Sequence, residues 1–174
     1  MPDQQTRDSI VQDFANMSAA LTGFQTGFLR PFADATNLSG IFYDFVVSQA
    51  GQEKMDALLN AFRPIQTQNP QTIADTLLET ASPNPPTEQA QLCQAIVAMW
   101  YLGSWYPPPF LASTSLQQVV SSQAYTKSLV WNVAQSHPMG FSTFKFGYWS
   151  EAPKSLDNFG VNTTNAPVST GGGQ

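Results

Sequence analysis

Charged side chains are scarce in this sequence of 174 residues. Lysine, arginine, aspartate and glutamate make up 11% of it, against about 25% in typical soluble domains. Seven basic and twelve acidic residues leave a net charge of −5, so nothing attracts nucleic-acid phosphates or an anionic membrane. Residues 89–126 contain no charged side chain. Because charge keeps a monomer's surface soluble, so long an uncharged stretch indicates core, partner interface or membrane.

Hydrophobic runs are too short for the membrane alternative. The longest, residues 95–103, falls well short of the roughly 20 apolar residues that a spanning helix needs. Pro107, Pro108 and Pro109 follow soon after and prevent its extension as a helix. Residues 1–9 are polar and no apolar segment follows them, so this end does not resemble a signal peptide. We therefore expect no direct membrane span.

Cysteine and histidine occur once each, as Cys93 and His137. A single cysteine excludes an internal disulfide, a multi-cysteine metal or iron–sulfur site, and the Cys-x-x-Cys-His attachment of a c-type haem. Cys93 lies in a helical pattern, which favours a buried inert thiol over the alternative of an intermolecular disulfide. His137 has no acid–base or metal-ligating partner nearby in the sequence, and its neighbours indicate a turn and a structural role.

Motifs of catalysis and cofactor binding are lacking as well. There is no Gly-x-Gly-x-x-Gly dinucleotide fingerprint and no Gly-x-Ser-x-Gly nucleophile elbow, so a Ser–His–Asp set would have to assemble from distant residues. Paired carboxylates such as Glu53 and Asp56 fall on polar helix faces. We therefore interpret them as solvent-exposed surface residues rather than as a catalytic pair. We therefore assign this chain no catalytic, cofactor-binding or metal-binding residue of its own.

Helical periodicity, by contrast, covers most of the chain. Ser39 is expected to cap the second helix, Thr87 to cap the fifth and Gly103 to stop it. The prediction is an all-α fold with a disordered N-terminus over residues 1–8 and a single helical domain of about five to six helices over residues 9–136. The expected helices cover residues 9–21, 39–50, 53–62, 72–80, 88–102 and 122–135.

Beyond the helices, the sequence predicts an extended C-terminal arm over residues 137–174 that ends in a flexible glycine-rich segment. Disordered tails are poor in aromatic residues, so this arm is expected to pack on something. Its own helices are one option, and another protein is the other, since aromatic residues are enriched at interface cores. The aromatic residues of the arm are Phe141, Phe144, Phe146, Tyr148, Trp149 and Phe159.

A second aromatic group follows the most apolar helical segment. These residues could stack a sugar or flavin ring, but their position favours core or interface. The predicted partner interface combines them with one residue of the last helix and five of the arm. It consists of Trp100, Tyr101, Trp105, Tyr106, Trp131, Phe141, Phe144, Phe146, Tyr148 and Trp149.

Several short motifs also follow one another in a set order and spacing. They are Arg7-Asp8-Ser9-Ile10 with Phe14, Ser18 and Thr22-Gly23, then Met99-Trp100-Tyr101-Leu102-Gly103, Ala124-Tyr125-Thr126-Lys127-Ser128-Leu129-Val130-Trp131, Tyr148-Trp149, and Glu151-Ala152-Pro153. Over residues 7–153 the chain thereby resembles the small subunit of the bacterial membrane-bound, FAD-dependent sugar and sugar-alcohol dehydrogenases. This is the sorbitol, fructose and glucose dehydrogenase group.

The resemblance implies a helical, non-catalytic subunit that embraces a large catalytic flavoprotein of the glucose–methanol–choline type. That partner binds FAD and oxidises the sugar or polyol, and the family pattern admits an iron–sulfur cluster in it that relays electrons. A membrane-bound multihaem cytochrome c accepts the electrons. The small subunit supports folding, stability and export of its partner, and it commonly carries the twin-arginine signal for both.

Two departures from the family pattern affect the expected form and subfamily. No twin-arginine segment is present, so the resemblance predicts either a mature form or a chain shortened before Arg7. It further predicts that the protein is periplasmic and is held at the membrane through its complex. Residues 106–123 and the tail after Pro153 are longer than expected. The alternative function is a free-standing helical binding module with an aromatic pocket for a carbohydrate or apolar ligand, and an enzyme in its own right ranks third.

Overall fold

The computed structural model describes residues 4–33, 35–82, 84–109, 116–138, 140, 141, 147 and 150. Over these residues the chain is mostly helical, as predicted. Its longer helices are α1 (Gln4–Thr22), α3 (Leu38–Ala50), α4 (Gln52–Phe62), α5 (Pro70–Leu78) and α6 (Glu88–Leu102). The shorter elements are α2 (Thr26–Leu29), the 3-10 helix η1 (Arg63–Ile65), α7 (Ser122–Thr126), α8 (Leu129–Val133), and an antiparallel pair of strands, β1 (Ser104–Trp105) and β2 (Gln118–Val119).

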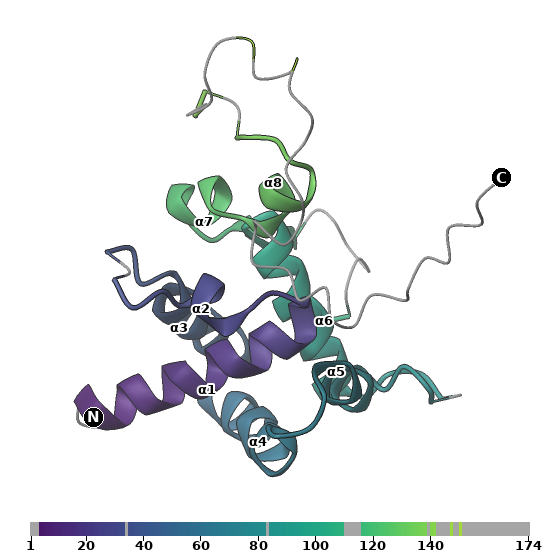
Figure 1. The fold of residues 1–174 in the computed structure, drawn as a ribbon. Helices are drawn as coiled ribbons and strands as arrows, with labels where there is room; N and C mark the ends of the chain where they lie inside the picture. The colour runs from purple at the N-terminus through teal and green to yellow at the C-terminus, as the bar shows by residue number, and fades with distance from the viewer. Residues whose placement is uncertain are drawn as a thin grey trace, which may run out of the picture.

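Helices α1 and α6 form the centre of the arrangement. They pack on each other, and α1 also contacts α2, α3, α4 and α5 (Figure 1). Helix α6 contacts α5 on one side and α3 on another, while α8 packs on it near its C-terminal end. No helix in the described part of the chain is long and apolar enough to cross a bilayer.

The core is densest around α6, because that helix carries apolar residues on nearly all sides. Its largest side chain, Trp100, packs edge-on against Phe42 of α3, with ring centroids 4.6 Å apart, and near Phe14 of α1 at 6.5 Å. Cys93 is fully buried in the same helix. Burial raises the pKa of the Cys93 thiol from 9.0 to about 12, so the group stays protonated and unreactive.

Local capping signals predicted several helix ends correctly. The Thr87 hydroxyl accepts a hydrogen bond from the Ala90 N–H at 3.3 Å, and Gly103 ends α6 with a φ of 65°. The predicted cap at Ser39 is wrong, because Asn37 precedes α3. Ser39 is instead buried and donates its hydroxyl to the Leu29 carbonyl at 2.8 Å, which ties α3 to α2.

Helix α1 begins earlier than its sequence signals indicated. The helix starts at Gln4, so residues 4–8 are helical rather than disordered as expected. Arg7 pairs with Asp44 of α3 at 2.6 Å, and Arg30 donates to the Asp8 carbonyl at 3.1 Å. These contacts join residues 37 and 22 positions apart, so no local pattern could indicate them.

The last predicted helix is two short helices. Residues 122–135 were expected to form one helix, but Ser128 adopts an extended conformation and separates α7 from α8. The break leaves the Tyr125 carbonyl as an acceptor for the Trp131 indole N–H, at 2.8 Å. Helix α2 and the β1–β2 pair were not predicted, since segments this short carry no periodicity to detect.

Most of the predicted C-terminal arm lies outside the described residues. Of residues 137–174, the structure describes residues 137, 138, 140, 141, 147 and 150. The extended arm therefore stays a prediction, as do the interface roles of Phe144, Phe146, Tyr148 and Trp149.

Candidate partner-binding site

The structure divides the predicted interface aromatics between core and surface. Trp100 and Trp105 are each 1% exposed, so both belong to the core of this chain, and Trp100 also borders a surface cavity. Trp105 faces Phe45 of α3, with ring centroids 6.2 Å apart. Both were placed at a partner interface because a core and an interface need the same apolar residue types, and sequence alone does not separate them.

The remaining described aromatics are at least partly accessible. Tyr101 is half-buried and donates its hydroxyl to the Thr22 carbonyl at 2.8 Å, which fastens the end of α6 to the end of α1. Burial raises the pKa of Tyr101 above its ordinary value of 10.0, so the hydroxyl keeps its proton and remains a donor. Tyr106 and Trp131 are half-buried, and Phe141 is exposed.

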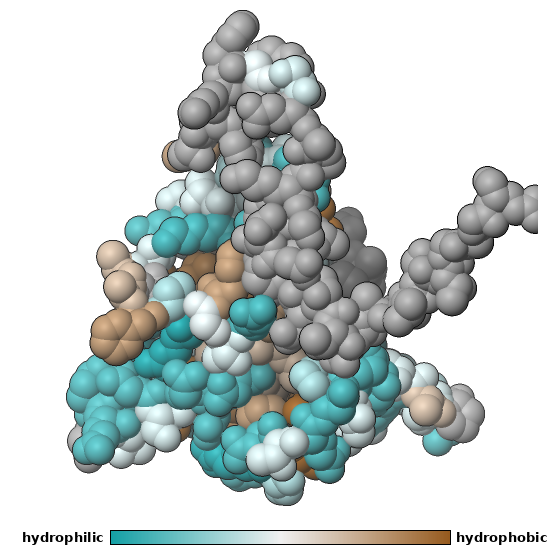
Figure 2. Space-filling view, in the orientation of Figure 1, coloured by the Kyte–Doolittle hydropathy of each residue, from teal (hydrophilic) through white to brown (hydrophobic). Residues whose placement is uncertain are grey.

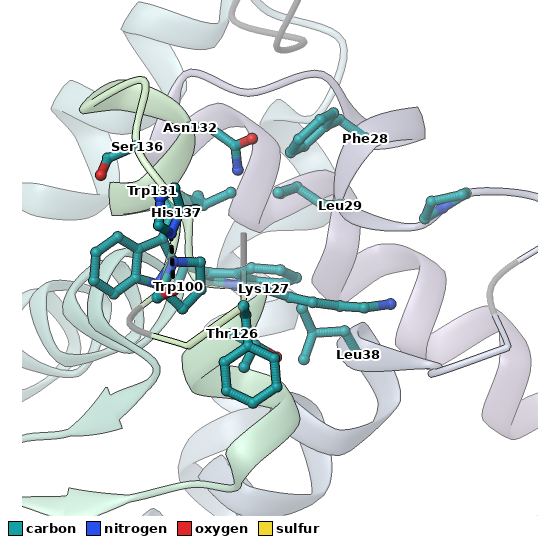
Figure 3. A pocket seen from close by; sticks show the side chains of 14 residues that line it. Phe28, Leu29, Leu38, Trp100, Thr126, Lys127, Trp131, Asn132, Ser136 and His137 are labelled. Carbon is teal, nitrogen blue, oxygen red and sulfur yellow. Dashed lines mark hydrogen bonds between the residues drawn. The ribbon is translucent and has the colours of Figure 1, made fainter. Parts of the chain in front are cut away.

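A cavity of about 400 Å³ opens at the surface where α2, α7 and α8 meet over the end of α6 (Figure 3). It is lined by three of the predicted interface residues, Trp100, Trp131 and Phe141. Phe28 and Leu29 of α2 face Trp131 and His137 across it. Its size is at the lower end of the range, about 300–1,000 Å³, that is usual for ligand pockets. We call this cavity the aromatic pocket.

Gly103 brings α7 close enough to form one wall of the aromatic pocket. A Cβ atom at this position would lie 2.7 Å from the Ala124 carbonyl oxygen and 2.7 Å from the Tyr125 backbone nitrogen. The residue also has a positive φ, which a side chain disfavours. The backbone of α7 therefore rests directly on the end of α6, and this contact places Thr126 and Lys127 at the pocket.

Trp131 is held in place from two directions. Its indole N–H donates to the Tyr125 carbonyl, and its ring meets the Tyr125 ring edge-on at 5.5 Å. Leu129, which is buried, joins α8 to the core below. The indole therefore forms a fixed wall of the aromatic pocket rather than a freely rotating side chain.

The opposite wall is provided by α2. Phe28 is 38% exposed and leans on Phe24, with ring centroids 5.4 Å apart, while Phe24 itself is buried against Tyr101. Leu29 is buried, and its carbonyl accepts from Ser39. Phe28 was not predicted as a site residue, because a helix of four residues gives no periodic signal in the sequence.

Charge is almost absent around the aromatic pocket. Lys127 is the one charged residue between Gln89 and Pro138, and it lines the cavity. Its ammonium group donates to the Thr36 hydroxyl, a neutral acceptor. None of the described lining residues is acidic.

The ion pairs of the described residues lie elsewhere, mainly on the faces of α1, α3 and α4. They are Arg7–Asp44, Arg30–Asp8, Lys54–Glu88 and Arg63–Asp13. Figure 2 shows hydrophilic surface over the N-terminal half of α1 and over α4, with hydrophobic residues around α2. Among the described residues, the ion pairs therefore lie on α1, α3, α4 and the ends of α2 and α6, and none involves a residue that lines the aromatic pocket.

No arrangement in the described residues indicates catalysis. No three histidine, cysteine, aspartate or glutamate side chains converge there as a metal site would require. His137 contacts the Pro138 carbonyl through Nδ1 at 3.0 Å, in the turn after α8. What the geometry offers is a binding surface, with rigid aromatic walls and one cation.

Comparisons with models of protein families, with curated proteins and with solved structures found no match for this chain. The likeness to the dehydrogenase small subunits therefore depends on the sequence motifs, three of which meet in space. Thr22 of the first accepts from Tyr101 of the second, and Gly103 of the second contacts Ala124 of the third. Residues from the three motifs thus contact one another near the aromatic pocket.

Proposed function

We propose that this chain is the non-catalytic small subunit of an FAD-dependent sugar or polyol dehydrogenase complex. Its partner is the large catalytic flavoprotein of the glucose–methanol–choline type, which holds the FAD and any iron–sulfur cluster. The small subunit supports folding, stability and export of that partner. The complex is periplasmic, attached to the membrane, and passes electrons to a multihaem cytochrome c.

The observation that carries the proposal is the nearly uncharged, aromatic side of the molecule. Exposed apolar residues gather on α2, α7, α8 and the segment after α8, as Phe28, Tyr125, Val133 and Phe141. Exposed apolar residues with little charge around them favour association over the monomer. Depletion of charge with enrichment of aromatics is the composition of an interface core.

The order and spacing of the three motifs along the sequence support the choice of family. In the fold, Tyr101 donates to the Thr22 carbonyl across 79 positions, and Gly103 accepts the close approach of α7 because it lacks a side chain.

A pull-down of the tagged full chain from its native host tests the proposal. We expect a large flavoprotein to co-elute, with a flavin absorbance spectrum and activity on a sugar or polyol. A colourless monomer that elutes without a partner would contradict the subunit assignment. It would favour the second candidate, a free-standing binding module.

The aromatic pocket itself is the observation that favours this second candidate. Aromatic walls with a few polar groups suit a carbohydrate or an apolar ligand. Titration of the isolated chain with glucose, sorbitol and fructose, followed by tryptophan fluorescence, would detect such binding through Trp131. Saturable binding by a monomeric chain would support the module over the subunit.

A further inference from the structure

The aromatic pocket is a concave site whose walls are formed by fixed side chains. Its volume of about 400 Å³ suits one or two inserted side chains rather than a whole helix. The walls come from segments far apart in the sequence, Phe28 on one side and Trp131 on the other (Figure 3). Pockets of this kind, lined by fixed aromatic side chains, receive the anchoring residue of a partner at protein interfaces.

The rim of the pocket favours an aromatic or other large apolar occupant. Phe28 is 38% and Phe141 59% exposed, so both rings present apolar surface that an inserted side chain would cover. Trp131 is fixed by its hydrogen bond to the Tyr125 carbonyl, so little side-chain entropy is lost when its face is covered. An inserted aromatic ring would make the most favourable contacts with these walls, because aromatic rings pack edge-on or offset against one another.

The charge of the pocket points to a carboxylate beside that ring. Lys127 is the one lysine or arginine among the described lining residues, its acceptor Thr36 is neutral, and none of these lining residues is acidic. None of the ion pairs formed among the described residues involves Lys127. A partner carboxylate placed here would gain an ion pair that becomes partly desolvated as the interface closes.

The floor of the pocket holds a further polar group. Trp100 is 1% exposed and lines the cavity, and its indole N–H has no acceptor among the described residues. Buried polar groups are normally hydrogen-bonded.

We infer that the aromatic pocket receives an aromatic side chain of the large flavoprotein, with a neighbouring aspartate or glutamate of that protein paired to Lys127. The inference rests on the proposed function, since it assigns the contact point of that same complex. It names the segment of the partner by its chemistry, an aromatic residue adjacent to an acidic one.

Carbodiimide cross-linking of the co-purified complex tests the pairing directly, because this reagent joins an amine to a carboxylate only where the two touch. We expect a cross-link between Lys127 and an acidic residue of the flavoprotein that lies next to an aromatic residue. Lys54, which pairs with Glu88 at 3.1 Å within this chain, provides the internal positive control. Peptide mass spectrometry identifies both links.

Charge reversal gives an independent readout. Lys127→Glu should lower the recovery of the flavoprotein at least about tenfold, because like charges would then face each other in the contact. Lys54→Glu makes the same change of net charge on an exposed site away from the pocket, and it should leave recovery unchanged. Circular dichroism of both variants checks that the helices are intact.

The outcomes separate the inference from the proposed function. If the flavoprotein co-elutes but Lys127 forms no cross-link to it and Lys127→Glu binds normally, the pocket assignment is wrong and the subunit assignment stands. A Lys127 cross-link to a second copy of this chain would also overturn the inference, in favour of self-association. If no flavoprotein co-elutes with the unaltered chain, the proposed function itself fails.

Discussion

Gly103 is the residue on which the geometry of the binding side depends most directly. It ends α6 with a positive φ, and its missing side chain lets the backbone of α7 rest on it. Gly103 therefore meets two requirements, a backbone with positive φ at the end of α6 and the absence of a side chain beneath α7. The first could be expected from the sequence, since glycine commonly ends helices. The second depends on α7, which lies more than 20 residues further along the chain.

Replacing Gly103 by alanine should destabilise the chain more than a positive φ alone explains. We expect a loss of about 2–4 kcal/mol in the free energy of unfolding, because strain in the left-handed region adds to a clash with backbone atoms that cannot rotate away. Gly23→Ala is the matched control. Gly23 has a φ of 79° but nothing within 4 Å of the added Cβ, so only the strain, about 1 kcal/mol, applies. Urea denaturation measures both, and equal losses would refute the close contact.

Cys93 provides a second prediction at the scale of a residue. Burial holds its pKa at about 12, against 9.0 when unperturbed. Because the pKa of this thiol is higher in the folded chain than in the unfolded chain, its contribution to the free energy of unfolding is complete below pH 9. That contribution is lost as the pH rises through the folded-state pKa. Iodoacetamide should therefore label the folded chain very slowly at pH 9.5 and the urea-unfolded chain quickly. Rapid labelling without denaturant would place the thiol at the surface.

At the scale of elements, the start of α6 depends on a contact with the turn after α5. The Glu79 carboxylate accepts hydrogen bonds from the Thr87 backbone N–H at 3.0 Å and from the Thr87 hydroxyl at 2.7 Å. Thr87 in turn caps α6. The two hydrogen bonds from Thr87 lower the pKa of Glu79 below 4.5, because they favour the charged carboxylate. The connection from α5 to α6 is thereby fixed at both ends of the proline-containing loop.

The lowered pKa predicts how Glu79→Gln behaves with pH. Because the pKa of Glu79 is lower in the folded chain than in the unfolded chain, its carboxylate stabilises the fold above about pH 4.5. This stabilisation is lost as the pH falls through the folded-state pKa. The unaltered chain should therefore be more stable than Glu79→Gln at pH 7, and the difference should shrink at pH 3. Urea denaturation at the two pH values measures it. Glu53→Gln, an exposed carboxylate at the start of α4, is the control, and an unchanging difference for Glu79→Gln would argue against the Thr87 contact.

At the scale of the whole molecule, the described helices share one buried core. The buried residues of the main cluster extend from Val11 to Leu129. Truncation after Ser136 should therefore keep the helical circular dichroism signal while it abolishes assembly with the flavoprotein, if the arm is the main anchor. Removing residues 137–174 also takes Phe141 from the rim of the aromatic pocket. Co-purification that survives the truncation would transfer the anchoring role to α2, α7 and α8.

The division of charge across the molecule predicts how the isolated chain behaves. With the aromatic side uncovered, the chain should self-associate as its concentration rises, and added salt should not reverse this, because apolar contacts are not screened. Analytical ultracentrifugation at 0.05 and 0.5 M NaCl measures the association. A monomer at both salt concentrations would count against the aromatic side as a partner surface.

The helices and the candidate site differ in how far the sequence predicted them. Thr87 was expected to cap a helix and Gly103 to end it, and both act as such. The pocket contains three predicted interface residues, but Phe28, which gives it a second wall, carried no motif or periodic signal. Lys127, which gives the pocket a charge, lies within a quoted motif but was assigned no role from the sequence. The break at Ser128 was missed because the spacing of Tyr125, Leu129 and Val133 suits one continuous helix.

The sequence by itself determined the helical class, most of the helix ends and the shortage of charge on one side. Caps, stops and periodicity act between residues a few positions apart, so they can be read along the chain. Only the tertiary structure decided that Trp100 and Trp105 are core while Trp131 lines a pocket, and that residues 4–8 continue α1. Burial depends on which surfaces pack together across long sequence separations, and an apolar residue suits a core and an interface equally well.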